Sequence, residues 1–145
     1  MKLSKEIING IIIFAGIGIY FLTINLLGFS DVFFLRLFNI LFIVYGVNRT
    51  IVSNLAEGKK DFLSNAMSAF ATSFSGVLLS IIGLWVYSHA RGGDVFVRTL
   101  SKSFLFGEDP SVNIYCVCLL FEGIASCIIV TLILMFYHNN KYAID

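Results

Sequence analysis

The sequence has few charged residues and only one proline. Asp, Glu, Lys and Arg make up 13% of the 145 residues, whereas hydrophobic residues make up 58%. This composition is typical of an integral membrane protein, and the length suits about four spans of roughly 20 residues without a separate soluble domain. The ten basic residues are scattered and the net charge is only +1. A nucleic-acid surface needs clustered Lys and Arg, so nucleic acid is excluded as a partner.

Cysteine and histidine are also scarce, which argues against metal and thiol chemistry. Cys116 and Cys118 point to different faces of a helix, and Cys127 lies in the same apolar run. We expect all three to be free side chains that pack as small hydrophobes. No His-Glu-x-x-His, Gly-x-Ser-x-Gly or paired-carboxylate pattern occurs. The sequence therefore predicts no enzyme activity, no cofactor and no metal site.

Long apolar runs make up most of the chain. The first follows Lys2 and Lys5, is longer than the apolar part of a signal peptide, and has no small-residue cleavage site after it. The runs predict spans at 7–27, 32–52, 62–87 and 111–137. We therefore expect residues 1–145 to form one all-α membrane domain, an antiparallel bundle of four transmembrane helices.

The connections between these runs support an antiparallel order. The second connection is a polar turn whose Asp61 is expected to cap the third span, and Asp109 followed by Pro110 predicts the start of the fourth. In the long third connection, Asp94 is expected to cap a short amphipathic helix with Phe96, Leu100 and Phe104 on one face. Such a helix suits the membrane surface, and an irregular loop over the bundle is the open alternative.

The basic residues predict an orientation with both termini in the cytoplasm, because short cytoplasmic loops carry an excess of Lys and Arg. In this orientation, six basic residues are cytoplasmic: Lys2, Lys5, Arg49, Lys59, Lys60 and Lys141. Four face the other side: Arg36, Arg91, Arg98 and Lys102.

The third span carries a stripe of small residues at steps of three or four. They are Asn65, Ala69, Ser73, Gly76, Ser80 and Gly83. Small side chains allow helices to approach closely in a membrane, so we expect this span to be the central helix. A pore lined by the hydroxyl groups on an adjacent face is the alternative; these are Ser64, Ser68, Thr72 and Ser75.

Glu122 is the only charged residue in the fourth apolar run. It lies about 12 Å along the helix from Ile114, so its carboxyl group needs a partner inside the bundle. The residues expected at a similar depth are Asn39, Arg36, Ser80, Thr23 and Tyr20. Two interpretations remain open: a structural carboxyl group satisfied by Asn39 or Arg36, or a site that binds and releases a proton or cation.

Three short segments resemble a known family. They run from Glu6 to Phe14, from Leu26 to Asp31 and from Gly58 to Phe62. Together they are similar to an uncharacterised family of small four-span bacterial inner-membrane proteins. The resemblance implies four spans and a bacterial inner-membrane location, and it implies no activity or site residues.

These observations favour a non-catalytic accessory or interaction subunit of a membrane complex. Its expected partners are the lipid bilayer and either other membrane subunits or further copies of itself. The alternative function is a small proton- or cation-coupled transporter or channel centred on Glu122.

Overall fold

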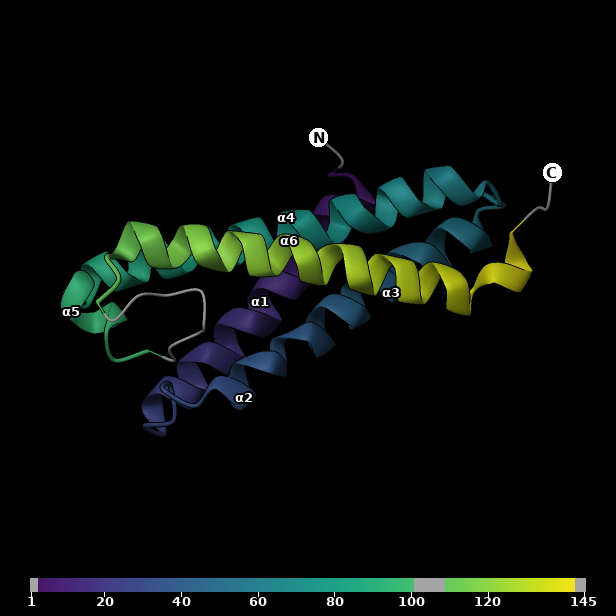
Figure 1. The fold of residues 1–145 in the computed structure, drawn as a ribbon. Helices are drawn as coiled ribbons and strands as arrows, with labels where there is room; N and C mark the ends of the chain where they lie inside the picture. Colours follow the sequence, from purple (N-terminus) through teal and green to yellow (C-terminus); the bar gives the residue numbers. More distant parts are fainter. Residues whose placement is uncertain (1–2, 101–108, 143–145) are drawn as a thin grey trace.

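The computed structural model describes residues 3–100 and 109–142, and within them it contains helices and no strands. Figure 1 shows the helices and their order along the chain. The α-helices are α1 Lys5–Leu26, α2 Phe33–Leu37, α3 Asn39–Ala56, α4 Phe62–Ala90, α5 Asp94–Val97 and α6 Val112–Tyr137. A short 3₁₀ helix, Asn139–Lys141, follows α6.

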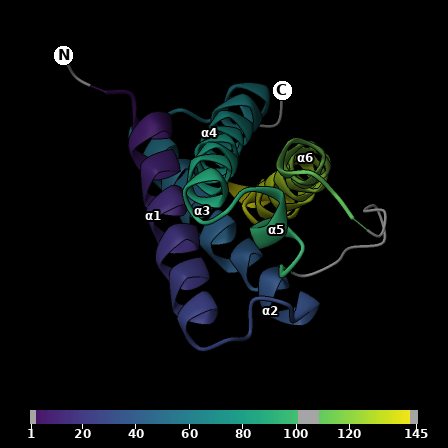
Figure 2. The same cartoon turned by 90° about the vertical axis from the view of Figure 1, so that its left-hand side faces the viewer.

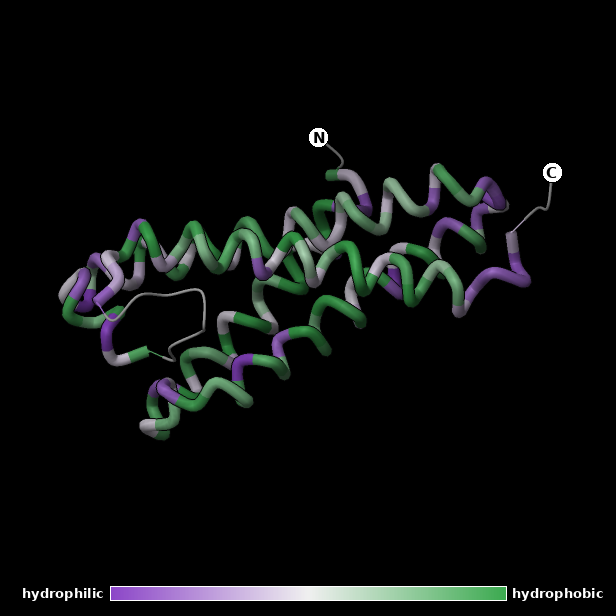
Figure 3. Tube along the Cα trace, viewed as in Figure 1, coloured by the Kyte–Doolittle hydropathy of each residue, from purple (hydrophilic) through white to green (hydrophobic). Residues whose placement is uncertain are grey.

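Four helical segments are long and apolar enough to cross a membrane: α1, α2 with α3, α4 and α6. Hydrophobic residues predominate along them, and hydrophilic residues gather at their ends (Figure 3). The prediction of a four-span all-α bundle is therefore confirmed. The protein is a multi-pass membrane protein whose span limits differ from the predicted ones by only a few residues.

The bundle has two distinct ends. The starts of α1 and α4 and the ends of α3 and α6 lie together at one end, here called the termini end. There Lys5 bonds to Asn54 and Glu57, and His138 bonds to Asn48. The opposite end, here called the α5 end, carries α5 and the connection between α1 and α2. Viewed from the α5 end, α1 and α6 lie on either side, with α4 above and α2 below (Figure 2).

Side-chain caps fix where three helices begin. Ser4 accepts from the Ile7 amide at α1, and Asp61 accepts from the Ser64 amide at 2.7 Å, which confirms the predicted cap of α4. The predicted cap at Asp109 is wrong, because Ser111 caps α6 by accepting from the Ile114 amide. Pro110 therefore lies before the cap and not in the first turn.

The central position of α4 is confirmed, since α4 contacts α1, α3 and α6. Four members of its small-residue stripe, Asn65, Ala69, Ser73 and Gly76, are buried, and the remaining two, Ser80 and Gly83, are half-buried. The stripe allows the backbones to come close. A Cβ atom added at Gly76 would lie 2.7 Å from Ile13 Cβ and 3.0 Å from the Gly10 carbonyl oxygen.

The second span is broken at Phe38. In a continuous helix the Leu35 carbonyl would accept the Asn39 amide, but here it accepts the Phe38 amide at 3.3 Å and the Tyr20 hydroxyl at 2.8 Å. A side chain that inserts into the backbone ladder is a known cause of helix breaks. Tyr20 of α1 thus turns the first part of the span, α2, into a separate short helix that carries Arg36.

The long connection between α4 and α6 contains the expected short helix, and this helix packs against the bundle. Gly93, with φ of 64°, caps α5 in place of Asp94. Val97 of α5 and the following Leu100 are buried against α6 at Val112 and Tyr115. The apolar face of this segment therefore covers the end of the bundle. Phe104 and Lys102, part of the predicted loop, lie outside the described residues.

Candidate functional site

Five of the six residues in the predicted polar cluster, Glu122 among them, line one cavity. It has a volume of about 630 Å³ and lies towards the α5 end, between α1 and α2 on one side and α4 and α6 on the other. Tyr20, Arg36, Asn39, Ser80 and Glu122 reach it from five different helices. The sixth predicted residue does not belong to the site.

That residue, Thr23, is exposed on the side of α1. Its hydroxyl donates to the Ile19 carbonyl of its own helix at 2.8 Å. This bond meets the hydrogen-bonding need of the hydroxyl group within α1. The prediction that Thr23 belongs to the cluster around Glu122 is therefore wrong.

An ion pair crosses the cavity from α2 to α6. Arg36 Nη2 donates to Glu122 Oε2 at 2.9 Å, with the two side chains only 17% and 27% exposed. The guanidinium group also lies 3.5 Å from Tyr115 Oη and 5.0 Å from the centroid of the Phe33 ring. Hydrogen bonding, opposite charge and an aromatic face thus hold Arg36 in one position.

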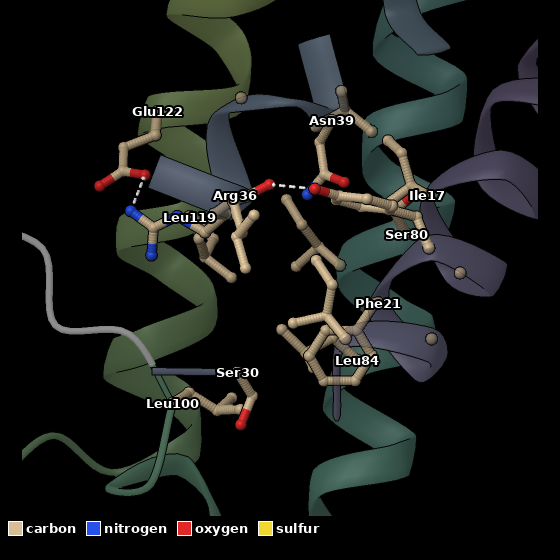
Figure 4. A pocket seen from close by; sticks show the side chains of 18 of the residues that line it. Ile17, Phe21, Ser30, Arg36, Asn39, Ser80, Leu84, Leu100, Leu119 and Glu122 are labelled. Atoms are coloured by element: carbon tan, nitrogen blue, oxygen red, sulfur yellow. Dashed lines mark hydrogen bonds and ion pairs between the residues drawn. The ribbon is translucent and has the colours of Figure 1, made fainter. Parts of the chain in front are cut away.

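Of the two partners left open for Glu122, Arg36 is the one that forms a bond to it in the structure. Glu122 and Asn39 lie on opposite sides of the cavity (Figure 4). Asn39 Oδ1 is buried and has no hydrogen-bond partner among the described residues. Ser80 does not reach Glu122 either, because its hydroxyl donates to the Gly76 carbonyl at 2.8 Å.

The remaining wall of the cavity is mainly apolar. Figure 4 shows Ile17, Phe21, Leu84 and Leu119 around the space between the ion pair and Asn39. In such surroundings an ion pair attracts more strongly than in water, and an unpaired charge is costly. Within residues 3–100 and 109–142, no three His, Cys, Asp or Glu side chains group as metal ligands.

A second polar cluster, in the half of the bundle nearer the termini end, had not been predicted as a unit. Asn9 Nδ2 donates to Thr50 Oγ1 at 2.8 Å, and Thr50 Oγ1 lies 2.9 Å from Thr72 Oγ1. All three side chains are buried, with Thr50 and Thr72 fully so. Asn9 belongs to α1, Thr50 to α3 and Thr72 to α4, so the cluster exists only where these three helices meet.

The same contacts bear on the alternative of a pore lined by hydroxyl groups. Ser64 is exposed, whereas Thr72 is buried and bonded to Thr50. Ser68 donates to Glu6 at 2.7 Å, and Ser75 donates to the Thr72 carbonyl. Ser68 and Thr72 therefore serve contacts with α1 and α3, whereas Ser75 bonds within α4, and the pore stays a prediction.

Several charged and titratable groups interact with one another at the termini end. Lys5 Nζ lies 2.7 Å from both Glu57 Oε2 and Asn54 Oδ1. The hydrogen bond from Lys5 lowers the pKa of Glu57 below its ordinary value. Burial lowers the pKa of His138, whose Nε2 lies 2.8 Å from Asn48 Oδ1. Both shifts stabilise the state in which Glu57 is charged and His138 is neutral.

The resemblance suggested by the three short segments stays a prediction. Among protein-family models, curated proteins and solved structures, none matches this chain.

Proposed function

We propose that the protein is a non-catalytic accessory or interaction subunit of a membrane complex, in a bacterial inner membrane and with both termini in the cytoplasm. The observation that carries this proposal is the ion pair between Arg36 and Glu122. The one carboxyl group deep in the fourth span is engaged in holding α2 against α6. Transport of a proton or cation by Glu122 would require this carboxyl group to leave Arg36 in each cycle, which breaks a hydrogen-bonded ion pair in a low-dielectric site.

The outer face of α6 supports an interaction role. Large apolar side chains follow one another along this face at steps of three, four and seven. They are Ile114, Val117, Phe121, Ile128, Leu132 and Phe136, and each is exposed. We call this set the α6 ridge. Lipid or a neighbouring helix can cover it, and a neighbouring helix is the proposed occupant because the side chains follow the i, i+4 rows that form a packing ridge on a helix.

Site-specific photocrosslinking in cells tests the proposal. A photoreactive amino acid replaces Phe121 on the ridge, and a matched control places it at Val52, which is exposed on α3. A discrete product at Phe121 and none at Val52 supports a fixed neighbour. Its mass distinguishes a second copy of this chain from another subunit. Equal yields or no product at both positions would contradict the interaction role.

A flux measurement tests the alternative of a transporter or channel with the same protein. Glu122→Gln in liposomes is expected to leave proton and cation flux equal to that of the wild type. A pH-dependent flux in the wild type that is lost in a folded Glu122→Gln variant would instead support a transporter.

A further inference from the structure

The cavity around Arg36 and Glu122 is about as long as one half of the hydrocarbon core of a membrane. Along α4 its wall runs from Val77 to Tyr87, and along α6 from Tyr115 to Ser126. Either distance is about 15 Å at 1.5 Å per residue, which equals half of a hydrocarbon core of roughly 30 Å. The cavity thus has the length of one lipid leaflet.

The rim of the cavity is open to the lipid-facing surface. Phe14, Leu22, Leu37 and Ile40 line the cavity and are also exposed on the outside of the spans. A ligand therefore has a lateral route from the bilayer that does not cross a polar barrier. The volume of about 630 Å³ lies in the usual range of roughly 300 to 1,000 Å³ for small-molecule sites.

The charges of the cavity select against a charged ligand. Arg36 and Glu122 are the charged residues of its described lining, and they neutralise each other at 2.9 Å. An anionic headgroup would have to displace Glu122 from its ion pair with Arg36. A cationic headgroup would do the same to Arg36. Both exchanges are unfavourable in an apolar site.

Asn39 adds a preference for a ligand that donates a hydrogen bond. It lines the cavity, and its buried Oδ1 has no partner among the described residues. A buried acceptor without a donor is destabilising, so a hydroxyl group placed beside Asn39 gains a bond that the protein leaves unmade.

We propose that this cavity is a lateral binding site for an uncharged, hydroxyl-bearing membrane lipid. Its apolar chain fills the space among α1, α2, α4 and α6, and its hydroxyl group bonds to Asn39 opposite the closed ion pair. The site goes beyond the proposed interaction role and does not depend on it, because the cavity faces away from the α6 ridge contacts that the crosslinking tests.

Native mass spectrometry of the protein released from mild detergent tests this site with three probes. Monoolein is uncharged and carries hydroxyl groups, methyl oleate is uncharged without a hydroxyl group, and lysophosphatidic acid is anionic. Monoolein is expected to be retained about fivefold more than methyl oleate, the effect of one net hydrogen bond. In Asn39→Leu, this preference is expected to disappear.

A matched pair of variants on α1 locates the binding. Gly18 lines the cavity, and a Cβ atom added there meets no atom within 4 Å, so Gly18→Phe is expected to fill the site without a clash. Its neighbour Ile19 is 68% exposed outside the cavity, and Ile19→Phe serves as the control. Gly18→Phe is expected to retain about tenfold less monoolein than the wild type, whereas Ile19→Phe is expected to retain as much as the wild type.

The proposal is overturned if Gly18→Phe retains monoolein as the wild type does, or if lysophosphatidic acid is retained as well as monoolein. Equal retention of all three probes would likewise overturn it, since that outcome reports nonspecific adhesion of lipid. Should Gly18→Phe fail to fold, Leu119→Phe fills the same cavity from α6 and is read by the same criteria.

Discussion

Removal of either partner of the Arg36–Glu122 pair is expected to destabilise the bundle, whereas removal of both is expected to change its stability little. Arg36→Leu leaves a carboxyl group without its cation, and Glu122→Leu leaves a guanidinium group that cannot lose its proton. The double variant leaves neither, because it replaces the pair by apolar side chains in a mainly apolar cavity.

The magnitude follows from distance and burial. Two unit charges at about 4 Å attract by roughly 4 kcal/mol at an effective dielectric constant of about 20. The pair has an N–O distance of 2.9 Å and is mostly shielded from solvent, so this regime applies. We expect a loss of about 2 to 3 kcal/mol for either single substitution, because each removes one partner of a shielded ion pair.

The double variant is expected to lose only about 1 kcal/mol, which gives a coupling energy of about 4 kcal/mol. This value would clearly exceed the average of about 0.6 kcal/mol for hydrogen bonds between membrane helices. The double variant should therefore be more stable than either single variant.

The assay is reversible unfolding in mixed micelles of a mild detergent and dodecyl sulfate, followed by the loss of helical circular dichroism. The control cycle combines Glu122→Leu with Thr23→Leu, whose hydroxyl bonds only within α1, and should give a coupling energy near zero. A coupling energy below about 0.5 kcal/mol for Arg36 and Glu122 would refute the reasoning, because contacting charged residues should couple more strongly.

Three further predictions concern the half of the bundle nearer the termini end. Gly76→Val is expected to lower the free energy of unfolding by at least about 2 kcal/mol, measured in the same micelles, because its side chain would overlap Ile13. Thr50→Val is expected to lower it by about 1 to 2 kcal/mol, since it leaves the buried amide of Asn9 without its acceptor; an unchanged value would mean that the amide finds another partner. Glu57 has a pKa below its ordinary value of 4.5, so its contribution to stability is present above that value and is lost as the pH falls through the lowered pKa. Thermal unfolding at a series of pH values should show a smaller loss of stability below about pH 4.5 in Glu57→Gln than in the wild type. Equal losses of stability in the two proteins would contradict this role.

The four spans could be predicted because each depends on a local property, the length of an apolar run. The central position of α4 could be predicted for a similar reason, since its small residues recur on one face. The depth of Glu122 also restricted its partners to a few residues, among which the long side chain of Arg36 reaches it.

Features that depend on contacts between helices could not be predicted. The break at Phe38 has no proline or glycine to mark it, because the hydroxyl of Tyr20 on another helix takes part in it. Thr23 lies at the expected depth but on the wrong face of α1. The cavity itself arises from the separation of α1 and α2 from α6, which no single segment encodes.

The arrangement of Asn9, Thr50 and Thr72 also has a consequence for how the protein is made. Asn9 belongs to α1 and Thr50 to α3, whereas Thr72 belongs to α4, which is synthesised later. At roughly 5 to 20 residues per second, synthesis from Ala56 to Ala90 takes a few seconds. During this time the first hairpin has its Asn9–Thr50 bond but lacks the glycine surface of α4 on which Ile13 packs. Nascent chains arrested before α4 should therefore stay with the insertion machinery, and those arrested after it should leave as a packed three-span unit that awaits α6.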